Sequence, residues 1–368
     1  MTLRKDYDPA ILLLAVALTC FGVVMVYSSS SIMAVKKYAD GFYFLKRQGV
    51  FALGGMLLLA ATMHFDYHHL RRLAAPFLLF CTALLVAVLI PGVGSHIGGA
   101  SRWIRLGIVS LQPSEVAKLG LVLYMAHSLA KKQGKIRTFK LGFIPYMVVL
   151  AILLFLLLLQ PDLGSALTLG GTAMIMLLVA GTRPTYVFSV VILALPFLYF
   201  LIMNVDYRRK RILAFLNPWE DPTNTGFQII QSWIAFGAGG LFGNGLGEGK
   251  QKLFYLPEAH TDFIFSVVGE ELGFAGVLVI SAMFLLFTLR GIRTALHAPD
   301  DFGRFLAFGI ALLLGLEAFV NIGVVMGMLP TKGLALPFIS YGGTSLLTTL
   351  LAVGILLNIS SQCRGDVR

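Results

Sequence analysis

Long apolar runs separated by short polar segments form the dominant pattern of the chain. Ten of these runs approach or exceed the length of about 20 residues that a helix needs to cross a membrane. The pattern therefore predicts an all-α polytopic membrane protein, a bundle of about ten transmembrane helices. The expected helices cover residues 10–31, 47–63, 74–91, 114–130, 141–159, 163–181, 186–204, 262–289, 302–328 and 341–360.

The fifth and sixth runs are separated only by Gln160, Pro161 and Asp162. Proline lacks a backbone donor and favours a turn at this point. Because one helix over both runs would be far longer than a bilayer requires, we expect a hairpin of two helices.

Basic residues in the short loops indicate the orientation in the membrane. The strongest cluster lies between the fourth and fifth helices, and cytoplasmic loops are enriched in lysine and arginine. We therefore expect both termini in the cytoplasm, although basic residues in the first outer loop oppose this orientation. The cluster comprises Lys131, Lys132, Lys135, Arg137 and Lys140, and the opposing residues are Lys36, Lys37, Lys46 and Arg47.

One long loop, residues 205–261, is then extracytoplasmic. It contains an aromatic-proline turn at 217–219, an amphipathic segment at 228–236 and a glycine-rich stretch at 237–249. Its basic run at 208–211 does not decide the orientation, because long loops follow the charge rule weakly. We predict a single membrane domain over residues 1–368, with this large structured loop inside it.

Composition and charge agree with a lipid environment. The chain is 57% hydrophobic and 13% charged with a mean hydropathy of +0.84, whereas soluble domains are about 25% charged. The net charge of +11 favours anionic lipid headgroups or phosphate-bearing ligands as partners, and no aromatic-basic motif predicts nucleic acid. The three cysteines have neither a disulfide nor a metal-binding spacing.

Polar residues that are unusual in a membrane protein collect near the predicted outer face. Each alone has an ordinary explanation as a helix cap, a turn residue or a lysine that reaches the interface. Together they predict a polar cavity, because ionisable residues in membrane segments are generally functional. The set comprises Arg102, Arg105, Gln112, Glu115, Lys118, Gln160, Asp162, Asp262 and Lys332.

Other polar residues in the helices are expected to pair with one another. Glu115 and Lys118 are three residues apart and can form an ion pair on one helix. Glu317 and Asn321, one turn apart, are interpreted as structural in the same way.

Glu270 and Glu271 lie about 12 Å deeper than Asp262 along the eighth helix, by its rise per residue. They are therefore expected to be structural, paired with a basic residue such as Lys118 or Arg102.

Two residues just before the eighth helix have open assignments. His260 is either a general base or, more commonly for a loop histidine, a capping or hydrogen-bonding residue. Glu258 is equally a substrate contact or a loop-packing residue. The glycines at 237–249 are no nucleotide fingerprint, because no strand precedes them and no GK[ST] follows.

Several long motifs resemble the SEDS family of shape, elongation, division and sporulation proteins, and the division branch most closely. The motifs are QPSEVAK, QPDLGSAL, the long segment QIIQSWIAFGAGGLFGNGLGEGKQKLFYLPEAHTDFIFSVVGEELGF, and GMLPTKGLALPFISYGGTSL. The resemblance implies a ten-helix fold in the bacterial inner membrane, at the division septum. It also implies peptidoglycan glycosyltransferase activity on lipid II, with a class B penicillin-binding protein transpeptidase and other division proteins as partners.

By the same resemblance, the family's essential aspartate falls on Asp262. Its important basic positions match Arg102, Lys118 and Lys332, and Ser340 in the last motif is a candidate substrate contact.

The chemistry of such a substrate agrees with one catalytic carboxylate. A glycosidase uses two carboxyl groups, one of which protonates the leaving group. A lipid-linked sugar leaves as pyrophosphate, already a stable anion, so Asp262 suffices as general base on the acceptor 4-hydroxyl. Arginine and lysine would neutralise the pyrophosphate, and a divalent cation, Mg or Mn, is a further candidate. Two other functions remain open: a lipid II flippase and a scaffold without catalysis.

Overall fold

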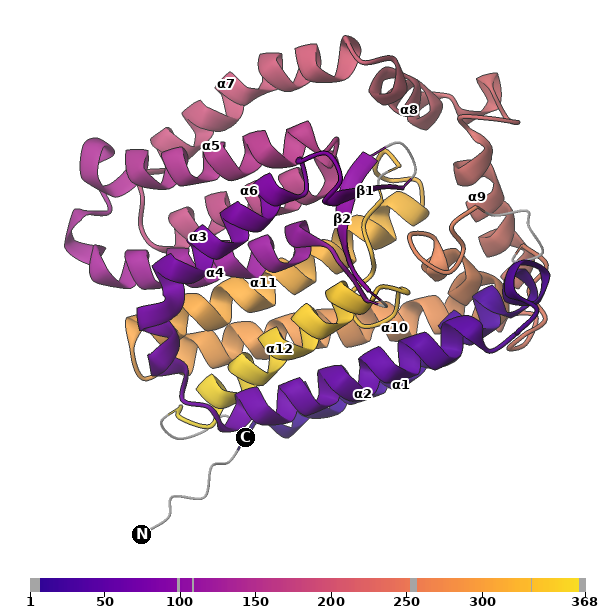
Figure 1. Ribbon diagram of the computed structural model, residues 1–368, viewed down its shortest axis with the longest axis horizontal. Helices are drawn as coiled ribbons and strands as arrows, with labels where there is room; N and C mark the ends of the chain where they lie inside the picture. Colours follow the sequence, from indigo (N-terminus) through magenta and orange to yellow (C-terminus); the bar gives the residue numbers. More distant parts are fainter. Residues whose placement is uncertain (1–6, 98–99, 108, 252–256, 332, 364–368) are drawn as a thin grey trace.

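The protein is described by a computed structural model that covers residues 7–97, 100–107, 109–251, 257–331 and 333–363. Within these residues, twelve α-helices run mostly side by side and a small sheet lies toward one end (Figure 1). The helices are α1 (Pro9–Tyr38), α2 (Tyr43–His64), α3 (Leu70–Ala87), α4 (Pro113–Lys131), α5 (Ile144–Leu159), α6 (Leu163–Val179), α7 (Pro184–Met203), α8 (Asp206–Leu216), α9 (Phe227–Gly239), α10 (Ile264–His297), α11 (Asp301–Val325) and α12 (Gly343–Ser360).

The predicted helical membrane fold is confirmed. Every expected span falls on a helix, namely α1 to α7 and α10 to α12. Eight of the described helices are long and apolar enough to cross a membrane, and α6 is a shorter apolar helix. Of the other three helices, α4 lies in the centre of the bundle, whereas α8 and α9 belong to the long loop, and α9 coincides with its predicted amphipathic segment.

A three-stranded antiparallel sheet adds to the predicted fold between α3 and α4. Its strands are β1 (Gly94–Ile97), β2 (Ala100–Leu106) and β3 (Val109–Leu111), in the order β1-β2-β3. The hydroxyl of Thr344, at the start of α12, donates to the carbonyl of Ser110 and accepts from the backbone of Gln112. The sheet is thereby fixed to the same end of the bundle as α12's first turn.

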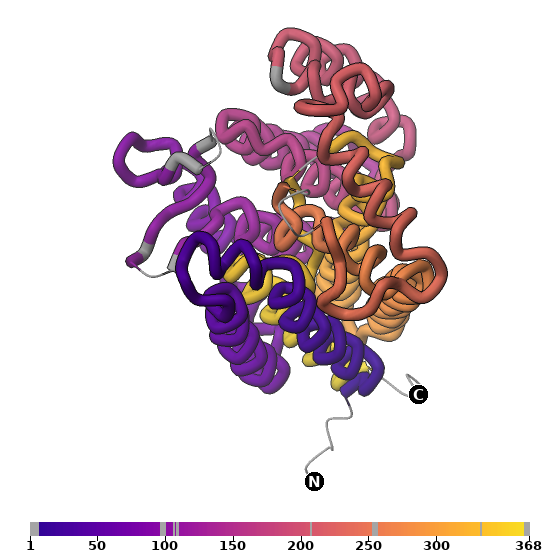
Figure 2. Tube along the Cα trace, turned by 90° about the vertical axis from the view of Figure 1, so that its right-hand side faces the viewer, coloured from indigo at the N-terminus to yellow at the C-terminus, as the bar shows by residue number. Residues whose placement is uncertain are grey.

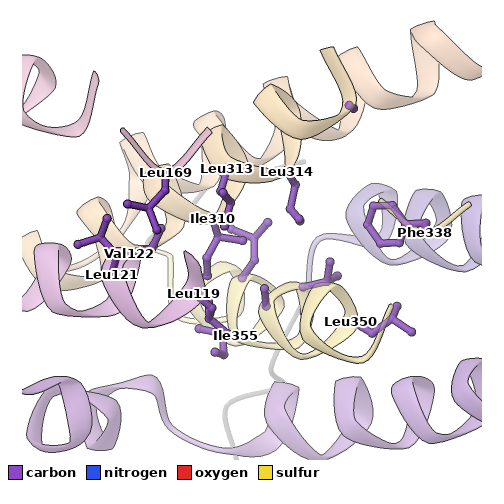
Figure 3. Packing of buried hydrophobic residues seen from close by; sticks show 14 of the residues in the cluster. Leu119, Leu121, Val122, Leu169, Ile310, Leu313, Leu314, Phe338, Leu350 and Ile355 are labelled. Atoms are coloured by element: carbon purple, nitrogen blue, oxygen red, sulfur yellow. The ribbon is translucent and has the colours of Figure 1, made fainter. Parts of the chain in front are cut away.

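The core is centred on α4, which packs against α3, α6, α11 and α12. Because α4 has helices on several sides, most of its positions are buried. Figure 3 shows Leu119 of α4 near Ile310 of α11 and Ile355 of α12. The helix α7 is the opposite case: Val187 is its one buried side chain among those described, as befits a helix facing lipid.

The two ends of the bundle differ in what they carry. The backbone of Asp8 donates to Ser360 Oγ at 3.1 Å, which places the start of α1 beside the end of α12. At the other end, on the right of Figure 1 and facing the viewer in Figure 2, lie α8 and α9, with the turn that precedes α10. The candidate site is built at this second end.

Candidate active site

Asp262 lies in a tight turn just before α10. The carbonyl of Glu258 accepts hydrogen bonds from the backbone of Thr261 at 3.1 Å and of Phe263 at 3.2 Å. The Thr261 hydroxyl also donates to the Glu258 carboxylate at 2.8 Å. These bonds fix the backbone on both sides of Asp262, so Glu258 has a clear role in holding the turn together.

The segment before α12 packs directly on this turn. The backbone of Tyr341 donates to the His260 carbonyl at 3.0 Å, and the Ser340 hydroxyl donates to the Thr261 carbonyl at 2.6 Å. The same hydroxyl accepts from the backbone of Leu336 at 2.8 Å, and Ser340 is 4% exposed. The Ser340 hydroxyl therefore joins two segments in this structure, and its role as a substrate contact stays a prediction.

Asn321 of α11 also connects the turn with the segment before α12. Its side-chain nitrogen donates to the carbonyls of Asp262 at 3.0 Å and Leu334 at 2.6 Å. Gly333 lies against the catalytic candidate: a Cβ there would be 3.0 Å from Asp262 Oδ2. Glycine thus lets the backbone approach the carboxylate closely. Lys332, the predicted pyrophosphate contact, lies outside the described residues.

Two arginines are held near Asp262 by backbone carbonyls. Arg102 of β2 donates from Nε to Gln160 at 3.1 Å and from Nη2 to Pro161 at 2.7 Å. Arg211 of α8 donates to the carbonyl of Thr331 at 3.2 Å. Arg102 was expected at the site, whereas Arg211 was not. Arg211 is the last of four consecutive basic residues, and the sequence does not show which of the four faces the site.

The surroundings raise the pKa of Asp262 to about 7. Burial is the main cause, because it penalises the charged carboxylate, and the nearby charges of Glu258 and Asp162 add to it. The positive charges of Arg211 and Arg102 act in the opposite direction. A carboxyl group that titrates near neutral pH is well matched to taking up and releasing a proton.

His260 is part of an aromatic cluster. Its ring centroid lies 4.9 Å from that of Phe44 and 5.8 Å from that of Tyr341. Burial lowers the pKa of His260, even though the charge of Glu258 acts to raise it. The contacts indicate packing between α2, the turn and the segment before α12.

Lys118 is enclosed in the bundle between two carboxylates. Its ammonium lies 2.8 Å from Glu115 Oε1, as the spacing predicted, and also contacts Glu317 of α11. Lys118 is 3% exposed. The structure therefore places Lys118 inside the helical bundle and not among the cations around Asp262.

Glu270 and Glu271 do not have the partners that we expected. The Glu270 carboxylate accepts backbone N–H bonds from Lys250 and Gln251, and Glu271 accepts from the Ser28 hydroxyl. The prediction that Lys118 or Arg102 pairs with them is wrong. The physical reason is that the loop preceding the turn folds back onto α10 and brings backbone donors to Glu270, while α1 brings the Ser28 hydroxyl to Glu271.

A divalent cation at the site stays a prediction. In the described part of the chain, no group of three or more His, Cys, Asp or Glu side chains is arranged to hold a metal ion.

Comparisons with known proteins agree with this arrangement. The family model FTSW_RODA_SPOVE, described as cell cycle protein, matches residues 9–365. A probable peptidoglycan glycosyltransferase FtsW of Geobacter metallireducens is 68% identical over 361 residues, 98% of this chain and 96% of the relative. The stage V sporulation protein E of Bacillus subtilis is 44% identical over 365 residues, 99% of this chain and all of that one.

Solved structures share the whole fold. One chain comes from work on the structural coordination of polymerization and crosslinking by a peptidoglycan synthase complex. It matches with a TM-score of 0.79 and 32% identity, over 96% of this chain and 98% of its own. The rod shape determining protein RodA of Thermus thermophilus matches with a TM-score of 0.73 and 30% identity, over 98% and 99%. With matches of this extent in sequence and in fold, the chain belongs to the FtsW/RodA/SpoVE family of cell cycle proteins.

Proposed function

We propose that this chain is a peptidoglycan glycosyltransferase that joins lipid II disaccharides into glycan strands on the outer face of the cytoplasmic membrane. One observation carries the proposal: a half-buried carboxyl group, Asp262, whose pKa is raised to about 7, in a turn that α11 and the segment before α12 hold in place. The relatives named as glycosyltransferases support the same activity.

In this proposal Asp262 is the general base. It takes the proton from the 4-hydroxyl of the acceptor sugar while that oxygen forms a bond to the anomeric carbon of the donor. The bond from the anomeric carbon to the pyrophosphate breaks, and the pyrophosphate leaves with the electron pair. Because this leaving group is already a stable anion, no second carboxyl group is required to protonate it.

The arginines near Asp262 are suited to stabilising the pyrophosphate as it leaves. A guanidinium has five N–H donors in a planar fork that matches phosphate oxygens. Arg102 uses Nε and Nη2 for backbone carbonyls, and these bonds orient the group. Preorganised cations of this kind act mainly on charge that develops in the transition state. We assign Arg102 and Arg211, together with Lys332, to the pyrophosphate.

The remaining assignments concern location and partners. The apolar flanks of the bundle would hold the polyprenyl tail in the lipid, and the turn with Asp262 would face the outside with both termini in the cytoplasm. A class B penicillin-binding protein transpeptidase is the proposed partner, supported by the likeness to a chain of a complex that coordinates polymerization and crosslinking. A role with other division proteins at the septum follows from the relatives named FtsW.

The burial of the deep charged residues favours a polymerase over a lipid II flippase. A flippase requires a polar path through the membrane, whereas Lys118 is paired with both Glu115 and Glu317. They line a small pocket of about 10 Å³, enough for about one water molecule.

Purified protein, supplied with lipid II in detergent and with its transpeptidase, tests the proposal. Detergent removes any need for bilayer crossing, so a polymerase produces glycan strands that a gel resolves, with or without an active transpeptidase domain. A flippase or a scaffold without catalysis yields no strands in this assay, and that result would overturn the proposed function.

A further inference from the structure

Helix α10 is interrupted shortly after Asp262. At Gly273 the backbone has φ 65° and ψ −164°, which is not helical and divides α10 into residues 264–272 and 274–297. Only glycine adopts such a conformation readily. A Cβ at this position would also lie 2.3 Å from the backbone nitrogen of Gly243, so there is no room for a side chain at position 273.

The loop of residues 240–251, here called the glycine loop, fills the interruption. In a continuous helix, the N–H groups of Phe274 and Ala275 would donate to carbonyls four residues earlier. Here they donate to the carbonyls of Gly240 and Leu241, at 2.9 and 3.0 Å.

The carbonyl groups left over by this exchange belong to Glu270 and Glu271. They accept from the backbone N–H groups of Asn244 and Gly245, at 3.1 and 3.0 Å. The glycine loop therefore replaces two helical hydrogen bonds with four of its own. The half-helix 264–272 is joined to the rest of α10 through the loop and not through a continuous hydrogen-bond ladder.

The side chain of Glu270 fastens the far end of the glycine loop. It is 1% exposed, and its carboxylate accepts the N–H of Lys250 at 2.6 Å and of Gln251 at 3.2 and 3.3 Å. A Cβ on Gly249 would lie 2.8 Å from Glu270 Oε2, so the backbone passes directly over the carboxylate. The N–H groups of two successive residues thus bind one buried carboxylate, which holds the loop against the half-helix.

We propose that Glu270 is a positioning residue for Asp262. Its carboxylate holds the glycine loop in the interruption of α10, and the loop in turn keeps the half-helix 264–272, with Asp262 just before it, in one orientation. The proposal rests on the proposed role of Asp262 as the base. Its structural part, that Glu270 immobilises the half-helix, can be measured independently of activity.

Two substitutions of Glu270 distinguish the effect of side-chain length from the effect of charge on holding the glycine loop. Glu270→Gln keeps the length of the side chain and an oxygen that accepts both N–H groups, but removes the charge. Glu270→Asp keeps the charge but is one methylene shorter and does not reach the loop. Glu248→Gln is the matched control, because Glu248 is an exposed carboxylate in the same loop.

Hydrogen–deuterium exchange of the purified full chain gives the first measurement. In Glu270→Asp, amides of residues 264–272 should exchange about tenfold faster or more, while those of residues 276–297 stay unchanged, since local opening is reported segment by segment. Polymerisation gives the second measurement: kcat should fall about tenfold, with KM for lipid II within about twofold of the unaltered chain. Glu270→Gln should show clearly smaller changes in both, and Glu248→Gln none.

Unchanged exchange of residues 264–272 in Glu270→Asp would overturn the proposal. It would be overturned equally if Glu270→Gln were as impaired as Glu270→Asp or more, because the charge and not the reach would then matter. The exchange result also separates this proposal from the proposed function. If Asp262→Asn polymerises lipid II normally while Glu270→Asp loosens the half-helix, the catalytic assignment fails and the positioning of the half-helix stands.

Discussion

The side-chain amide of Asn321 donates a hydrogen bond to the backbone carbonyl of Asp262 at 3.0 Å. The same nitrogen donates to the carbonyl of Leu334, so one buried side chain joins the turn before α10 to the segment before α12. Asn321 lies one turn from Glu317, which contacts Lys118. The candidate base is thus connected to the centre of the bundle through α11.

Removal of this side chain should impair catalysis more than folding. Asn321→Ala leaves two carbonyls without their donor, at a cost of about 1–3 kcal/mol. If that cost falls on the position of Asp262, polymerisation should decrease roughly 10- to 100-fold. The strand yield and the membrane abundance of the variant are to be measured together. Asn204→Ala, at an exposed asparagine, is the control. A variant with normal abundance and normal strand yield would contradict the connection.

The pH dependence of polymerisation should follow the charges around Asp262. Because the base must be deprotonated and its pKa is about 7, kcat/KM should rise with pH up to about 7 and then level. Glu258→Gln removes a charge that raises this pKa, so the rise should move to lower pH. Arg211→Ala removes a charge that lowers it and should move the rise to higher pH.

The test is to measure kcat/KM against pH in one buffer series for the unaltered chain, Glu258→Gln and Arg211→Ala. Arg209→Ala is the control for Arg211, since Arg209 is an exposed neighbour on α8 and its charge is not among those that shift Asp262. Coincident profiles for the unaltered chain, Glu258→Gln and Arg211→Ala would mean that the titrating group is not Asp262.

The sequence was most informative about the helices that cross the membrane. A run such as 144–159 is almost wholly apolar and nearly long enough to cross a membrane. These two properties together predict a membrane helix. The sheet at β1–β3 was not anticipated, because its strands are short and lie between the expected spans, where hydropathy carries little information. The interruption at Gly273 was equally hidden, since a glycine within an apolar run usually continues the helix.

The site was only partly predictable for a related reason. The turn with Asp262 could be named from its motif, and the pair Glu115–Lys118 from its spacing. The third member, Glu317, is 199 positions away from Lys118, and no local pattern connects them. Arg211 could not be distinguished from the other basic residues at 208–211, because its position beside Thr331 depends on the packing of α8.

The proposed orientation can be tested without any activity. In a variant whose native cysteines are replaced, a cysteine at Asn224 should react with a membrane-impermeant thiol reagent in intact spheroplasts. A cysteine at Gly134 should react only after lysis, because the basic loop after α4 is expected in the cytoplasm. Both positions are exposed, so burial does not limit the reaction. The reverse labelling pattern would place Asp262 on the cytoplasmic side and remove the basis for an outer-face site.

The most direct test of the central claim is the polymerisation of lipid II in detergent by purified Asp262→Asn. Asparagine keeps the shape of the side chain but cannot take up the proton, so strand synthesis should fall about 100-fold or more. Membrane abundance should remain normal, and Asp206→Asn, at an exposed aspartate of α8, should polymerise like the unaltered chain. Glycan strands made by Asp262→Asn at nearly the unaltered rate would contradict the assignment of Asp262 as the general base.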